Sequence, residues 1–166
     1  FNRIYGDVFP IPDGVYGERL QGTDGMNKMG KSYGNAIDLM DSVDCVQEKV
    51  MAMMTDPGRA QATDPGCPEV CSAFHYREKF DAENRDSVAT ACRQGAVGCT
   101  TCKGELATVL NDFLTPFRER RAEFEQQPNL VRDILNLGCA KARIEGQRTL
   151  EFVKDAMGLK YEGLIG

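Results

Sequence analysis

The sequence predicts a mainly α-helical protein with a short α/β segment at its amino end. Apolar residues recur every three or four positions through most of the second half, which is typical of amphipathic helices. Before residue 34, glycine and proline interrupt every apolar run, so we expect short strands joined by loops there. The helices are expected to pack as a small bundle.

The helices are expected in the following order. The first covers roughly 42–54, with an N-cap at Asp41-Ser42, and a shorter one covers roughly 82–92. A long helix ends before Pro128. Its expected buried face carries Leu106, Val109 or Leu110, Phe113, Phe117 and Phe124. Beyond Asn129 we expect two helices, which are interrupted at Gly138 and end near Met157.

Composition excludes several classes of protein. A formal net charge of −5 is unsuited to coating nucleic acid through bulk charge, so any RNA contact must be a local basic patch. No apolar run approaches the roughly 18 residues of a membrane span, so we expect a cytoplasmic protein without a membrane partner. Seven cysteines are an odd number, which favours metal or thiol chemistry in a reducing compartment over a disulfide framework.

A glycine-punctuated loop carries two lysines at Lys28 and Lys31, followed by Ser32. Two ammonium groups on a flexible backbone suit a polyphosphate, with Ser32 and backbone N–H groups as further donors. A solvated loop with two lysines is the competing interpretation, because short motifs of this kind are common.

Three cysteines are closely spaced as Cys92-x6-Cys99-x2-Cys102, and twenty residues separate Cys71 from Cys92. Four thiolates are able to hold Zn²⁺ or a [4Fe–4S] cluster, and the spacing alone leaves the metal open. Buried free cysteines are the alternative interpretation.

The wider strings are more specific than either motif. Gly22-Thr23-Asp24-Gly25, Lys28-Met29-Gly30-Lys31-Ser32-Tyr33-Gly34-Asn35 and Thr55-Asp56-Pro57 resemble the KMSKS region and its surroundings in class I aminoacyl-tRNA synthetases, and the bacterial tryptophanyl-tRNA synthetases in particular. The resemblance runs from Phe1 to about Gly158. It implies an ATP-dependent ligase that activates tryptophan and transfers it to tRNA(Trp), and that is expected to form a homodimer.

The resemblance also implies roles for single residues. Lys28 and above all Lys31 would stabilise the pyrophosphate of Mg²⁺-bound ATP during activation, and Gly30 and Ser32 would complete the nucleotide-binding loop. Gly30 stands where the family has its central serine, which removes one hydroxyl donor. A second ATP signature of the family, a His-x-Gly-His-like string, is absent from this sequence, which has one histidine.

We therefore expect the carboxy-terminal portion of a synthetase, inactive without its amino-terminal half. Residues 1–40 would be the end of the catalytic nucleotide-binding domain of Rossmann type, and residues 41–166 the helical anticodon-binding domain. A subset of the family holds a [4Fe–4S] cluster with a similar cysteine pattern, which implies Cys71, Cys92, Cys99 and Cys102 as ligands and Zn²⁺ as the alternative. The spacing between Cys71 and Cys92 is slightly shorter than in that subset, so Cys67 is the substitute for Cys71.

Four basic residues are candidates for contact with RNA near the anticodon: Lys103, Lys141, Arg143 and Arg148. Arg118 and its neighbours Arg120 and Arg121 are expected to lie on a solvated helix face paired with glutamates. Two functions of other classes stay open, namely a stand-alone metal-containing RNA-binding or scaffold module and a thiol redox protein.

Overall fold

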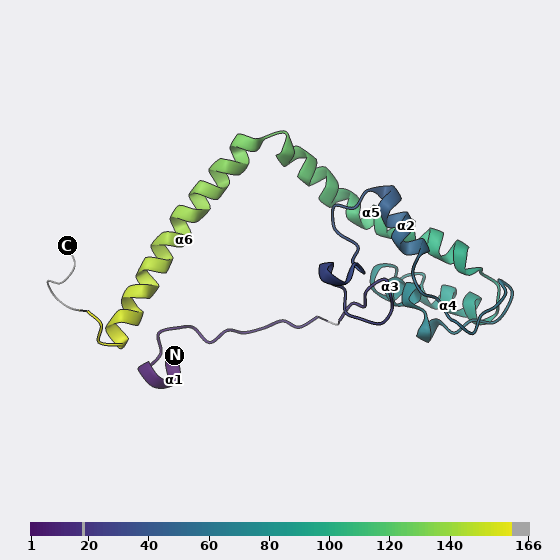
Figure 1. Ribbon diagram of the computed structural model, residues 1–166, viewed down its shortest axis with the longest axis horizontal. Coiled ribbons are helices and arrows are strands. Elements are labelled where there is room, and N and C mark those ends of the chain that lie inside the picture. Colours follow the sequence, from purple (N-terminus) through teal and green to yellow (C-terminus); the bar gives the residue numbers. More distant parts are fainter. Residues whose placement is uncertain (18, 161–166) are drawn as a thin grey trace. The chain divides into compact units, whose positions relative to one another are not determined.

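The computed structural model describes residues 1–17 and 19–160, and in these residues it consists of helices joined by loops (Figure 1). Its helices are α1 (Asn2–Tyr5), η1 (Lys31–Tyr33), α2 (Val43–Met51), η2 (Pro68–Val70), α3 (Ser72–Phe80), α4 (Arg85–Arg93), α5 (Cys99–Glu125) and α6 (Pro128–Ala156). The predicted mainly α class is therefore confirmed.

The contacts divide the described chain into two compact units. The smaller unit contains residues 1–17 and 123–160, and the larger unit contains residues 19–122. Both regions of predicted chemistry, the lysine loop and the main cysteine group, belong to the larger unit.

The core of the larger unit is formed by α2, α3 and α5, and Figure 1 shows α2 running beside α5. Val46 and Val50 of α2 meet Tyr76 of α3 and Leu106 and Leu110 of α5 in one buried cluster. Burial of apolar area of this kind is the main favourable contribution to folding. The same three helices support the loop that carries the lysines.

Local sequence explains where α2 begins. The Ser42 hydroxyl oxygen accepts a hydrogen bond from the Cys45 backbone N–H at 3.2 Å, as an N-cap does. The predicted cap is thus correct, and α2 ends slightly earlier than expected, at Met51. The helix predicted near 82–92 is present as α4.

Helix α3 was not predicted from the sequence, because a charged residue occupies one of its buried positions. Arg77 is 2% exposed, so a polar residue occupies an inward position and breaks the apolar pattern. Its guanidinium pairs with Asp81 and with Glu105, and it donates to the Cys102 carbonyl at 2.9 Å. These partners compensate the cost of removing the charge from water.

The long helix α5 begins at Cys99, so the last two cysteines of the pattern lie on its first turn. Its buried residues are Leu106, Ala107, Leu110 and Leu114. Phe113 and Phe117, which were expected on the buried face, are 47% and 42% exposed. The face that packs is rotated toward Leu114, and the aromatic rings instead form an edge-to-face and tilted row with Phe80.

A single helix, α6, covers the region where two helices were expected. Gly138 does not interrupt it, because one glycine costs a helix only about 1 kcal/mol relative to alanine. No described residue of α6 is buried.

The short strands expected before residue 34 are not found among the described residues. This region contains α1, and its pairing is limited to an isolated antiparallel bridge between Gln21 and Lys28. A strand needs a partner strand, and in the described chain no neighbouring segment supplies one. None of the helices in the described residues combines the length and the apolar character needed to cross a membrane.

Candidate functional site

The lysine loop is closed at its base by backbone pairing. The Gly22 N–H donates to the Asn27 carbonyl at 2.8 Å, and the Met29 N–H donates to the Leu20 carbonyl at 3.3 Å. The chain then passes Gly30 and forms the short helix η1, which ends at Gly34. Lys28 therefore lies at the paired base, and Lys31 lies beyond it.

Asn35 holds the two sides of the loop together. Its side chain is buried, and its Nδ2 donates to Asp24 Oδ2 at 3.0 Å and to the Lys28 carbonyl at 3.2 Å. Its Oδ1 accepts from the Gly30 N–H at 2.9 Å. One buried amide thus satisfies donors and acceptors from three parts of the loop.

Gly22 makes this arrangement possible. A Cβ atom at Gly22 would lie 2.0 Å from Asn35 Nδ2 and 2.3 Å from Asn35 Cγ. Any larger residue would displace the amide that joins the two sides of the loop. The glycine is required for close approach, since its φ is not in the left-handed region.

Asp24 and Tyr76 stabilise the base of the loop through hydrogen bonds to its backbone. Asp24 Oδ1 accepts from the backbone N–H groups of Met26 and Asn27 at 3.1 and 3.2 Å. Desolvation acts to raise the pKa of Asp24, but these bonds and the one from Asn35 bring it below 3.8. The Tyr76 hydroxyl donates to the Gln21 carbonyl at 2.7 Å, and burial, with the Asp24 charge, raises the pKa of Tyr76 to about 12.

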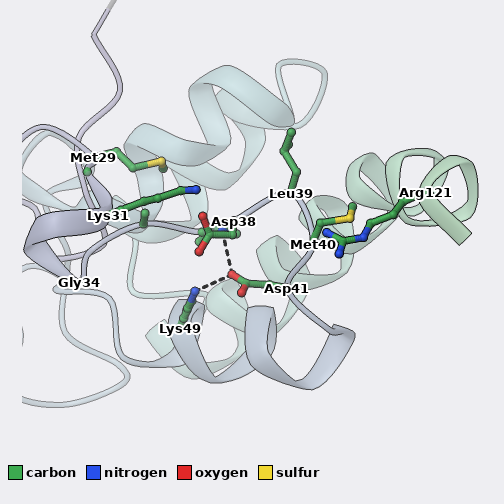
Figure 2. Close-up of a pocket in the computed structure, with 12 residues that line it drawn as sticks. Met29, Lys31, Gly34, Asp38, Leu39, Met40, Asp41, Lys49 and Arg121 are labelled. Carbon is green, nitrogen blue, oxygen red and sulfur yellow. Dashed lines mark hydrogen bonds and ion pairs between the residues drawn. The ribbon is translucent and has the colours of Figure 1, made fainter. Parts of the chain in front are cut away.

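Beyond the loop opens a cleft of about 850 Å³ (Figure 2). Lys31, Lys49 and Arg121 contribute cationic groups to its lining, and Asp38 and Asp41 contribute carboxylates. In Figure 2 the Lys31 side chain extends over the cleft toward the segment that carries Asp38. The cleft is large enough for a nucleotide-sized ligand.

Of the four residues predicted to bind the nucleotide, two lie in the cleft lining and two do not. Lys31 and Gly30 line the cleft, whereas Lys28 and Ser32 are outside its lining. The Gly30 N–H is already bonded to Asn35, so it is not available to a phosphate in this conformation. An exposed ammonium at the rim of an open cleft can stabilise negative charge on a bound group.

The second candidate site is a cavity lined by Cys71, Cys92, Cys99 and Cys102. These are the four cysteines that the sequence singled out, and the fold brings them together from the junction of η2 and α3, from α4 and from α5. Burial raises the pKa of the Cys71 and Cys92 thiols, and the Arg59 guanidinium opposes the effect at Cys92.

Arg59 lines the same cavity and contacts one of its sulfurs. Its Nη1 donates to Cys99 Sγ at 3.6 Å, and its Nη2 donates to the Val97 carbonyl at 2.7 Å and to the Ala62 carbonyl. Its buried Nε has no hydrogen-bond partner. Sequence analysis gave Arg59 no role, and a lone arginine in a turn offers no signal for one.

Gly95 lies in the turn between α4 and α5, which also carries Val97 of the cavity lining. It has a φ of +68°, and a Cβ atom there would lie 2.2 Å from the Thr63 carbonyl oxygen. The turn between α4 and α5 therefore needs a residue that lacks a side chain and tolerates left-handed geometry.

In this structure the four thiols are not arranged as the ligands of a single metal ion. Among residues 1–17 and 19–160, no three His, Cys, Asp or Glu side chains are grouped to hold a metal ion. The cavity has a volume of about 20 Å³, which is about the space of one water molecule. A [4Fe–4S] cluster, in which each thiolate binds a different iron, would require the lining residues to move apart.

The remaining cysteines lie elsewhere. Cys67, the substitute for Cys71, is exposed, and its thiol donates to Glu69 Oε2 at 3.1 Å. Cys45 and Cys139 lie outside the cavity lining, and Cys139 is exposed. The His75 Nδ1 atom lies 3.2 Å from Glu78 Oε2, in a local hydrogen bond.

The predicted RNA-binding residues are divided between the two compact units. Lys103 lies in the larger unit, where its ammonium donates to the Met51 and Met53 carbonyls at 2.9 and 2.6 Å. Lys141, Arg143 and Arg148 are exposed on α6, and the Arg148 guanidinium lies 5.7 Å from the centroid of the Phe152 ring. An RNA contact by Lys103 would have to compete with the bonds that end α2.

Besides Arg59, sequence reasoning missed the roles of Asn35 and Arg118. Asn35 was quoted as part of a motif, but nothing in the sequence shows that it is buried. Arg118 was assigned to a solvated face, whereas its Nε donates to the Asp41 carbonyl at 2.7 Å.

The larger unit thus presents a lysine loop beside a cleft large enough for a nucleotide. Residues 1–115 match the family "tRNA synthetases class I (W and Y)". The chain belongs to this family.

The proteins most similar in sequence and structure among those compared include members of the same family. The tryptophan–tRNA ligase of Treponema pallidum is 46% identical over 99% of this chain, and that of Aquifex aeolicus is 42% identical over 96%. The tryptophanyl-tRNA synthetase of Campylobacter jejuni, solved with ADP and tryptophan, has a TM-score of 0.77 and 27% identity over 95% of this chain. The alignments cover 50%, 41% and 50% of these three proteins, so the chain spans about half their length.

Proposed function

We propose that this chain is the carboxy-terminal part of a tryptophan–tRNA ligase. The intact enzyme activates tryptophan with ATP and Mg²⁺ and transfers it to tRNA(Trp). Two similar proteins carry this enzyme name, and a third was solved with ADP and tryptophan. The observation that carries the proposal is Lys31 at the rim of a cleft of about 850 Å³, on a loop held by Asn35.

In this function Lys31 stabilises the charge that develops on the pyrophosphate as the tryptophan carboxylate attacks the α-phosphate. Lys28, Gly30 and Ser32 complete the loop that closes over the nucleotide. Residues 1–40 belong to the catalytic nucleotide-binding domain and residues 41–166 to the anticodon-binding domain. The enzyme is a cytoplasmic homodimer, and this chain by itself is inactive because it supplies one wall of the ATP site.

The proposal is tested by tryptophan-dependent ATP–pyrophosphate exchange. The protein from the complete coding region, or this chain with the missing half added in trans, should be active. Lys31→Ala should lower kcat by about a hundredfold to a thousandfold, as the loss of one group that stabilises transition-state charge does. Lys28→Ala, outside the cleft lining, is the matched control and should lower kcat less. Absence of exchange together with RNA binding would favour a stand-alone RNA-binding or scaffold module.

A [4Fe–4S] cluster bound by Cys71, Cys92, Cys99 and Cys102 is part of the same proposal. The presence of all four cysteines in one cavity lining and the contact from Arg59 to Cys99 support it, and the lining would have to move apart to admit the cluster. The cluster would hold η2, α4 and the start of α5 together. Anaerobically purified protein should contain iron and sulfide and absorb broadly near ~400 nm. Stoichiometric zinc without iron would replace the cluster with the zinc interpretation.

Contact with the anticodon region of tRNA(Trp) is assigned to Lys103, Lys141, Arg143 and Arg148. The three residues on α6 are exposed, as a phosphate or base contact requires. Single glutamine substitutions should raise the KM for tRNA and leave ATP–pyrophosphate exchange unchanged. Equal losses in both assays would place these residues outside tRNA recognition.

A further inference from the structure

Arg118 links the long helix α5 to the wall of the cleft. Its Nε donates to the Asp41 carbonyl at 2.7 Å, and its Nη2 donates to Asn111 Oδ1 at 2.8 Å. The planar guanidinium is thus held by two acceptors in different directions, which fixes its orientation.

Asp41 is also held through its side chain. Its Oδ2 accepts from the Asp38 N–H at 2.8 Å and from Lys49 Nζ at 2.6 Å, as Figure 2 shows. The carboxylate therefore joins its own segment to α2, while its carbonyl joins the segment to α5. Asp41 is the point at which three parts of the larger unit meet.

These bonds fix the far end of the segment that forms the cleft wall. Residues 36–41 line the cleft together with Lys31. The buried Asn35 holds the segment at one end, and Asp41 holds it at the other. A segment held at both ends samples fewer conformations, so the wall facing Lys31 keeps its shape.

We propose that Arg118 is a positioning residue for nucleotide chemistry in this cleft, because it holds Asp41 and thereby the wall that faces Lys31. Arg118 does not line the cleft itself and acts through Asp41. The chemical part of this inference rests on the proposed function, namely that the ligand of the cleft is ATP.

The variants separate positioning from general stability. Arg118→Gln removes the positive charge and the planar set of guanidinium N–H donors. Arg118→Lys retains a cation that reaches one of the two acceptors, so its effect should be intermediate. Arg132→Gln, at an exposed position of α6, is the control for loss of one positive charge.

The first measurement is hydrogen–deuterium exchange on the complete protein without nucleotide. Arg118→Gln should speed exchange of the amides in residues 36–41 and leave those of α3 unchanged. Faster exchange throughout the larger unit in both Arg118 variants would overturn the proposal, because Arg118 would then be a general structural residue. Wild-type exchange rates in residues 36–41 would overturn it as well.

The second measurement is ATP–pyrophosphate exchange by the same protein. Arg118→Gln should lower kcat about tenfold to a hundredfold, the range expected when a reacting group is misplaced, with the KM for tryptophan unchanged. Wild-type kcat in Arg118→Gln would overturn the catalytic part of the proposal. If wild-type protein itself lacks activity, the proposed function fails, while the amide exchange still decides whether Arg118 holds the cleft wall.

Discussion

The lysine loop and the cysteine cavity lie in the same compact unit but are held in place by different forces. The loop is fixed by hydrogen bonds that converge on one buried amide, Asn35. The cysteine cavity is formed by partly buried thiols and by a turn that passes close to the Thr63 carbonyl. A loop that has to present charge to solvent is stabilised locally by polar bonds, whereas a cavity that holds thiols depends on close packing.

In each region one glycine allows a contact that no other residue would permit. At Gly95 the neighbour is a backbone carbonyl, and at Gly22 it is the side chain of Asn35. A side chain can move aside and a backbone carbonyl cannot do so without moving the chain. Substitutions at the two glycines should therefore differ in cost.

The largest effect is expected for Gly95→Ala. The new Cβ would lie 2.2 Å from the Thr63 oxygen at a φ of +68°, so both overlap and backbone strain contribute. We expect the free energy of unfolding of the larger unit to fall by more than about 3 kcal/mol, measured by urea denaturation. A loss below about 1 kcal/mol would show that the turn adapts easily.

Gly22→Ala should cost less, about 1–3 kcal/mol, because Asn35 can rotate away at the expense of its hydrogen bonds. Lys31 should become more mobile, which spin labelling or NMR of the loop would detect. Gly104→Ala is the control, since no atom lies within 4 Å of its Cβ position on α5. That variant should be more stable than wild type by about 0.5–1 kcal/mol.

Tyr76→Phe tests the link between the core and the loop. It removes the hydrogen bond to the Gln21 carbonyl and leaves the ring in place, so we expect a loss of about 1 kcal/mol. Ultraviolet titration should show one tyrosine of wild type with a pKa of about 12, and this transition should be absent in the variant. A tyrosine titration identical in both proteins would contradict the burial of this hydroxyl.

The smallest effect is the acid sensitivity of the loop. The pKa of Asp24 is lowered from 3.8 in the folded protein, so its contribution to stability is present above pH 3.8. That contribution is lost as the pH falls through the lower, folded-state pKa. Asp24→Asn should abolish this part of the acid dependence, measured as the difference in unfolding midpoint between neutral and acidic pH. Equal acid dependence in both proteins would show that other carboxylates dominate.

Several features could be predicted from sequence because they depend on neighbours in the chain. The cap at Ser42, the stop before Pro128 and the spacing of the cysteines are local patterns. The mainly helical class follows from apolar periodicity, which is the same whichever way the helices pack together. The apolar periodicity did not predict which face of α5 is buried. Whether Phe113 or Leu114 enters the core depends on which helices pack against α5.

The sequence by itself determined which residue types were available for chemistry, namely two lysines on a glycine-punctuated loop and four cysteines at characteristic spacing. Only the tertiary structure decided that Lys31 lines the cleft and Lys28 does not, and that Cys71 joins the other cysteines while Cys67 stays exposed. The physical reason is that these outcomes depend on contacts between segments distant in the sequence, such as Asp41 with Arg118. Spacing along the chain carries no information about such contacts.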